Sequence, residues 1–143
     1  MNFLDEHTSY ELPVDIESIV SKVWLNIEYF SFDKINWFIY WDTITINSNL
    51  SLAEQRFTIA HELWHYVDGE IWTSTGIFAC TDFKEKKADK FAMDILCPTE
   101  QVKELWEEYQ NIPTLAQCLL VPEKIIINKL KLIYPWNESY NLL

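Results

Sequence analysis

Residues 51 to 65 read SLAEQRFTIAHELWH, and this stretch decides how the rest of the chain is interpreted. Ser51 followed three residues later by Glu54 forms a capping box, which predicts the start of a helix. The apolar and histidine positions that follow recur at helical spacing on one broad face. We expect the helix to run to about Asp68, with Gly69 ending it.

The two histidines of this helix are four residues apart, which places His61 and His65 about 40° apart around the helix axis. Two imidazoles in this arrangement can bind one zinc ion. Glu62 is rotated by about 100° from His61, which keeps it off the metal but within reach of a water molecule, so it is the expected general base. The alternative is a helix that merely buries two hydrogen-bonded histidines.

A catalytic zinc site needs a third protein ligand and one open position. The remaining histidine, His7, lies far upstream in a polar segment, so the third ligand should be a carboxylate. The downstream candidates are Asp68, Glu70, Asp82, Glu85 and Asp89.

Glu85 is the favoured candidate because it lies on a second predicted helix, from about Asp82 to Leu96, that can return antiparallel to the first. Asp89 follows one turn later on the same face, where it could accept a hydrogen bond from a zinc-bound histidine and fix its tautomer. Ala88 and Ala92 on this face would let the two helices approach closely. The alternative interpretation of Glu85 is a solvated acid near a helix N-terminus.

The remaining segments predict an α+β fold in a single domain. Helical periodicity indicates a first helix over 14–23, and β-rich runs at 24–30, 37–41 and 43–47 predict a small antiparallel meander. This sheet should pack on the two metal-binding helices. A short helix should follow Pro98, and a helical tail of two short helices is expected over 113–134, divided at Val121-Pro122. The core would then span about 12–110, and 137–143 should fray.

The charge balance restricts the possible partners. Eleven basic and 22 acidic residues give a net charge of −11, which disfavours direct binding of nucleic acid. The sequence contains neither a signal peptide nor an apolar run long enough to span a bilayer, so we expect a cytoplasmic protein. Three widely spaced cysteines, Cys80, Cys97 and Cys118, are expected to be free thiols.

Two segments of the sequence resemble the ImmA/IrrE metallopeptidases: RFTIAHELWHY at 56–66 and EKKADKFAMDILCP at 85–98. The likeness extends more weakly over about 12–134. It implies a gluzincin-like, and therefore zincin-like, α+β fold, with Zn²⁺ held by His61, His65 and Glu85 and water activated by Glu62. Members of this family are bacterial or mobile-element proteins that cleave, or promote cleavage of, helix-turn-helix transcriptional repressors. A zinc-dependent endopeptidase acting on such a repressor is therefore expected.

The chain departs from the family pattern at three positions. Trp64 replaces a glycine inside the metal motif, Asp89 stands where asparagine is common, and Cys97 replaces a methionine. The bulky indole must alter the surroundings of the site and could narrow the cleft. A zinc-containing regulator that docks onto a repressor or a toxin without hydrolysis is therefore the alternative function.

Two further features remain open at the level of sequence. The side chain that stabilises the oxyanion could be Tyr40, Tyr66 or His7. The C-terminal tail resembles the helical pair that follows the peptidase core in this family. Its lysines, at positions 124, 129 and 131, give it little basic character, so it is expected to pack or to dock a partner rather than to bind DNA.

Overall fold

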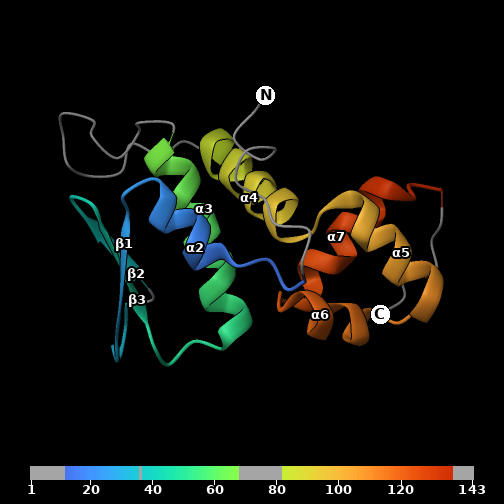
Figure 1. Cartoon of the computed structure of the whole chain (residues 1–143), viewed down its shortest axis with the longest axis horizontal. Coiled ribbons are helices and arrows are strands. Elements are labelled where there is room, and N and C mark those ends of the chain that lie inside the picture. Colours follow the sequence, from blue (N-terminus) through green and yellow to red (C-terminus); the bar gives the residue numbers. More distant parts are fainter. Residues whose placement is uncertain (1–11, 36, 68–81, 137–143) are drawn as a thin grey trace.

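The computed structural model describes residues 12–35, 37–67 and 82–136. Within these residues a three-stranded sheet lies at one end, α2 and α3 lie beside it, and the C-terminal helices lie at the opposite end (Figure 1). The α+β class is confirmed. The elements are α2 (Ile16–Lys22), β1 (Asn26–Phe30), β2 (Trp37–Tyr40), β3 (Thr43–Asn47), α3 (Leu52–Val67), α4 (Asp82–Leu96), α5 (Thr99–Tyr109), α6 (Ile112–Leu119) and α7 (Glu123–Ile133).

The sheet is mixed, with the strand order β1-β3-β2. β2 and β3 pair antiparallel, as predicted, whereas β1 pairs parallel to β3, so the predicted antiparallel meander is wrong for the first strand. The segment between β1 and β2 passes the end of β3, where the buried Asn47 side chain holds it. The amide nitrogen of Asn47 donates to the carbonyl oxygens of Phe32 (3.0 Å) and Ile35 (2.9 Å). These bonds anchor the connection between β1 and β2 at the end of β3.

The helix boundaries follow from local capping. The Ser51 hydroxyl accepts a hydrogen bond from the backbone N–H of Glu54 at 3.2 Å, which confirms the predicted start of α3. Asp15 caps α2 in the same way, by accepting from the N–H of Ser18 at 3.0 Å. None of the helices in the described part of the chain is long and apolar enough to cross a membrane.

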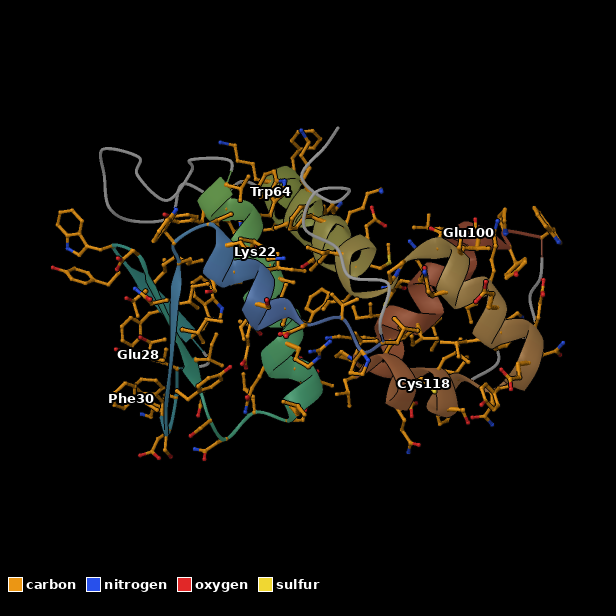
Figure 2. The ribbon with its side chains drawn as sticks, in the orientation of Figure 1. Lys22, Glu28, Phe30, Trp64, Glu100 and Cys118 are labelled. Atoms are coloured by element: carbon orange, nitrogen blue, oxygen red, sulfur yellow. The ribbon has the colours of Figure 1, made fainter. Side chains whose placement is uncertain are left out.

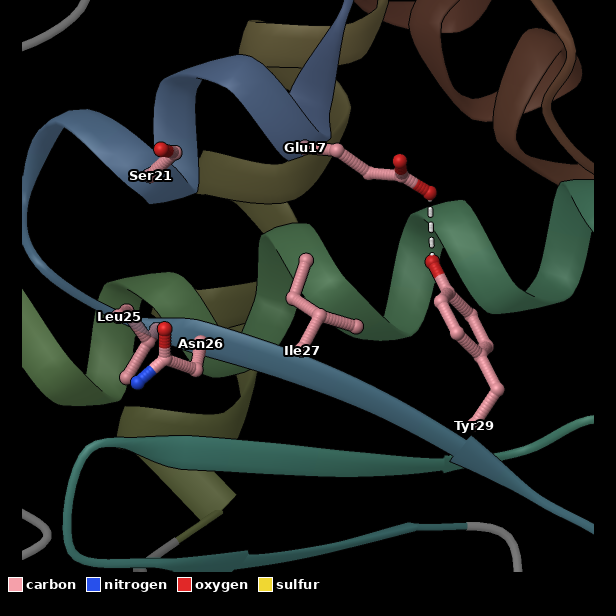
Figure 3. A pocket seen from close by; sticks show the side chains of 6 residues that line it. All are labelled: Glu17, Ser21, Leu25, Asn26, Ile27 and Tyr29. Carbon is pink, nitrogen blue, oxygen red and sulfur yellow. Dashed lines mark hydrogen bonds between the residues drawn. The ribbon is translucent and has the colours of Figure 1, made fainter.

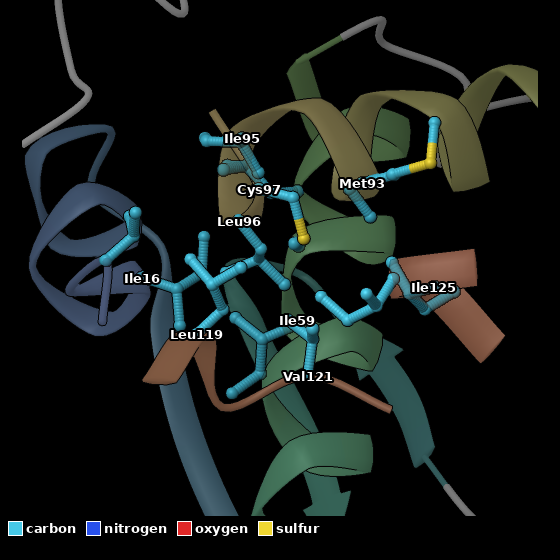
Figure 4. Packing of buried hydrophobic residues seen from close by; sticks show 14 of the residues in the cluster. Ile16, Ile59, Met93, Ile95, Leu96, Cys97, Leu119, Val121 and Ile125 are labelled. Atoms are coloured by element: carbon cyan, nitrogen blue, oxygen red, sulfur yellow. The ribbon is translucent and has the colours of Figure 1, made fainter. Parts of the chain in front are cut away.

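The hydrophobic core is continuous from the sheet to the C-terminal helices, and α3 runs through it. Ile59 of α3 is buried with Leu96 of α4 and with Leu119 at the end of α6 (Figure 4). Leu63 of α3 belongs to the same buried cluster. The predicted tail helices are present as α6 and α7, and they complete the same core. α7 is further joined to α4 by an ion pair between the buried Lys129 and Asp94 at 3.1 Å.

One buried arginine joins three parts of the chain. Arg56 lies on α3 and is only 9% exposed. Its Nη2 donates to the backbone oxygen of Val14 at 2.7 Å, and its Nε donates to that of Leu120 at 3.1 Å. Arg56 therefore fixes α3 against the segment before α2 and the residue that ends α6. Arg56 was not among the residues predicted to have a role, although a charged residue between apolar helical positions is a signal for such a contact.

Candidate metal centre

Helices α3 and α4 pack together and bring His61, His65 and Glu85 into one cluster. The Nε2 atoms of the two histidines are 3.3 Å apart. One carboxylate oxygen of Glu85 lies 2.9 Å from His61 Nε2 and the other lies 3.0 Å from His65 Nε2. Ala88 and Ala92 of α4 are both fully buried, consistent with the close approach expected from their small side chains.

The chemistry and spacing of these groups fit a zinc ion. Two imidazoles and one carboxylate are a donor set typical of catalytic zinc sites. Tetrahedral geometry with bonds of about 2.0–2.1 Å separates neighbouring ligand atoms by roughly 3.3 Å. The donor atoms of the cluster all lie within 4.8 Å of one another, and the separation of the histidine nitrogens agrees with the tetrahedral value.

Asp89 contacts the second ring nitrogen of His61. Its Oδ1 lies 2.7 Å from His61 Nδ1. If Nδ1 carries the proton and donates it to this carboxylate, the lone pair of Nε2 faces Glu85 and His65, which is the tautomer that metal binding requires. Asp89 itself is largely exposed, so its charge is shared with solvent. This is the contact that the i, i+4 spacing of Glu85 and Asp89 led us to expect.

The buried carboxylate of Glu62 lies beside the cluster. It is 1% exposed, and its Oε1 is a buried oxygen without a hydrogen-bond partner among the described residues. Burial, and secondarily the negative charge of Glu85, raises the pKa of the Glu62 carboxyl to about 8. The same oxygen lies 3.7 Å from His61 Nε2. An unpaired carboxylate oxygen beside the donor cluster has the position that a general base needs to accept a proton from water in the site.

Trp64 lies beside the cluster on α3, and Figure 2 shows it near the end of that helix. Its ring meets the ring of His65 edge to face at a centroid distance of 5.2 Å. The indole therefore packs against a donor residue, in line with the expectation that it alters the surroundings of the site.

Cys97 is fully buried at the end of α4, and burial raises the pKa of its thiol to about 12.

The other ligand and oxyanion-stabilising residues considered from the sequence are either outside this cluster or outside the described residues. Tyr40 is 70% exposed on β2, and Tyr66 is half-buried on α3. Asp68, Glu70 and His7 lie outside the described residues, as does Gly69, and the side chain of Asp82 is not described. The identity of an oxyanion-stabilising side chain stays a prediction.

Comparison with known proteins supplies the family. The family model described as IrrE N-terminal-like domain, Peptidase_M78, matches residues 26–131, which include the whole cluster. The chain belongs to this family. Membership in the IrrE N-terminal-like family supports a role related to metallopeptidases and confirms the resemblance stated from the two sequence segments.

The fold of the chain also resembles that of a solved structure. The chain is similar to a Mycobacterium tuberculosis transcriptional regulator, with a TM-score of 0.62 and 13% sequence identity. The similarity covers 81% of this chain but only 40% of that protein, so it concerns one part of a longer molecule and shows the fold alone. No curated protein sequence matches the chain significantly.

Proposed function

We propose that this protein is a zinc-dependent endopeptidase that cleaves a helix-turn-helix transcriptional repressor or a similar regulatory protein. One observation carries the hydrolytic part of the proposal. One buried carboxylate oxygen, Oε1 of Glu62, has no hydrogen-bond partner among the described residues and lies beside three side chains whose donor atoms are spaced as a zinc ion requires. A purely structural metal site does not require this group, because burying a carboxylate oxygen without a hydrogen-bond partner costs free energy.

Each residue of the centre has a distinct task in this proposal. His61, His65 and Glu85 would hold the ion, and Asp89 would keep His61 in the binding tautomer. When bound, zinc supplies a Lewis acid for the peptide carbonyl and lowers the pKa of water in the cleft. Glu62 accepts the proton from water and passes it to the leaving amine.

A protein substrate is supported by charge as well as by family. The net charge of −11 would attract a basic DNA-binding domain and speed encounter at low salt. The C-terminal helices offer little for direct binding of DNA. Lys129, one of the three lysines of this region singled out above, is 5% exposed and paired with Asp94.

The test uses the zinc-loaded protein and the repressor whose gene lies nearest to its own. We expect about one zinc ion per chain by elemental analysis and one or two discrete repressor fragments. Both a chelator and Glu62→Gln should suppress the fragments, while Glu62→Gln should retain the metal. A protein that does not bind zinc would exclude the catalytic proposal.

The alternative function is a regulator that docks onto a repressor or a toxin without hydrolysis. The packing of Trp64 against His65 is the observation that favours it, because the indole occupies space beside a donor residue. An intact repressor that forms a stable complex, unaffected by Glu62→Gln, would support this alternative. Unselective digestion of casein would instead indicate a general peptidase.

A further inference from the structure

β1 is an edge strand of the sheet as far as the described residues show. The backbone N–H of Asn26 donates toward β3 at 2.6 Å, and the backbone oxygen of Phe30 accepts from the same side at 2.8 Å. Because backbone groups alternate in direction along a strand, those of Ile27 and Tyr29 point to the opposite, outer edge. The outer edge thus presents two N–H and two C=O groups in the arrangement that an added strand uses.

A groove runs along this edge, between β1 and α2 (Figure 3). Its volume is about 200 Å³. The residues that line it are Glu17 and Ser21 from α2, and Leu25, Asn26, Ile27 and Tyr29 from β1 and the residue before it. A groove between a helix and an edge strand is the geometry in which several peptide-binding domains receive an extended segment as an extra strand.

The lining of this α2–β1 groove selects a basic side chain. Leu25 is buried and Ile27 is half-buried, so they provide an apolar surface for a methylene stem. Glu17 provides a carboxylate, one oxygen of which accepts a hydrogen bond from the Tyr29 hydroxyl at 2.6 Å. A carboxylate has two oxygens, so it can accept from an incoming cation as well.

We propose that the α2–β1 groove binds an extended segment of a partner protein, which adds to β1 as a strand and places a lysine or arginine side chain against Glu17. Backbone hydrogen bonds to Ile27 and Tyr29 supply affinity, and the Glu17 carboxylate supplies selectivity. The groove shares no residue with the cluster of His61, His65 and Glu85. The proposal therefore stands whether or not the protein hydrolyses its partner.

The probe is a short synthetic peptide that alternates valine with arginine, added to the full chain carrying Glu62→Gln so that the peptide stays intact. Amide hydrogen exchange followed by NMR should show slower exchange at Ile27 and Tyr29 when the peptide is bound, with the amides of β2 unchanged. A peptide methylated on alternate backbone nitrogens cannot pair with a strand edge, so it should bind at least about ten-fold more weakly.

Charge reversal tests the side-chain part. Glu17→Lys should weaken binding of the arginine peptide by about ten-fold and favour a peptide that alternates valine with glutamate. Glu108→Lys, an equal charge change at an exposed position of α5, should leave both affinities unchanged. The proposal would be overturned if the arginine peptide did not bind, or if the methylated peptide bound with the same affinity. It would also be overturned if Glu17→Lys left the affinity for the arginine peptide unchanged, or if the peptide protected only amides of β2. Protection of Ile27 and Tyr29 without peptide, in a protein that dimerises, would overturn it in favour of a second copy of the chain.

Discussion

Replacement of Arg56 by methionine should destabilise the protein strongly, because the change removes two hydrogen bonds while leaving their acceptors in place. The backbone oxygens of Val14 and Leu120 lose donors at 2.7 Å and 3.1 Å. A hydrogen bond from a charged group contributes about 1.5–3 kcal/mol, so the gross loss is about 3–6 kcal/mol.

Part of this loss is offset, because burial of the guanidinium is itself unfavourable. Desolvation lowers the pKa of Arg56, opposed chiefly by the charges of Asp15 and Glu17. Removing the buried cation recovers some of that cost, so we expect a net decrease of about 2–4 kcal/mol in the free energy of unfolding. Such a decrease is a large share of the 5–15 kcal/mol that is typical of a domain. Arg56→Lys should fall between, since an ammonium cannot reproduce the fork of donors.

Urea unfolding of the metal-free protein, followed by tryptophan fluorescence, measures this difference. Lys103→Met is the matched control, because Lys103 is a half-buried cation whose ion pair with Glu100 is long, at 3.7 Å. Its loss should cost less than about 0.5 kcal/mol. If Arg56→Met unfolded at the same urea concentration as the control, with an unchanged slope, the proposed role of Arg56 in fixing α3 would be refuted.

Three further predictions concern the metal centre and its surroundings. Glu85→Ala should lower zinc affinity more than Asp89→Ala, whose loss should cost about 10- to 100-fold, and competitive metal titration of both variants decides the order. In the metal-free protein the pKa of Glu62 is raised from 4.5 to about 8, so the folded state binds this proton more tightly than the unfolded state. The free energy of unfolding should therefore fall as pH rises between these values, and Glu62→Gln should flatten the profile measured by urea unfolding; parallel profiles would contradict this. Because burial raises the pKa of the Cys97 thiol to about 12, iodoacetamide should label it only after unfolding, and labelling of native Cys97 as fast as of Cys118 in peptide mass spectra would show that it is accessible.

The features that depend on local spacing could be predicted from the amino-acid sequence. The start of α3 followed from Ser51 and Glu54, and the extent of α4 followed from its apolar period and Pro98. Helical periodicity also placed His61 with His65, and Glu85 with Asp89, on shared faces, because positions four apart on a helix are neighbours whatever surrounds them. The proximity of the two pairs then required only that the helices return antiparallel, and the structure brings them together.

Strand pairing and the burial of charged residues depend on contacts between segments that are distant in the sequence. The parallel pairing of β1 with β3 depends on the path of the chain past Asn47, and an alternating strand pattern does not contain that information. The burial of Glu62 and the carbonyl contacts of Arg56 likewise arise from segments distant in sequence. The periodicity of apolar residues predicts which side of a helix or strand a residue occupies. What lies against that side, and whether a charge there finds a partner, is set by the packing of the whole chain.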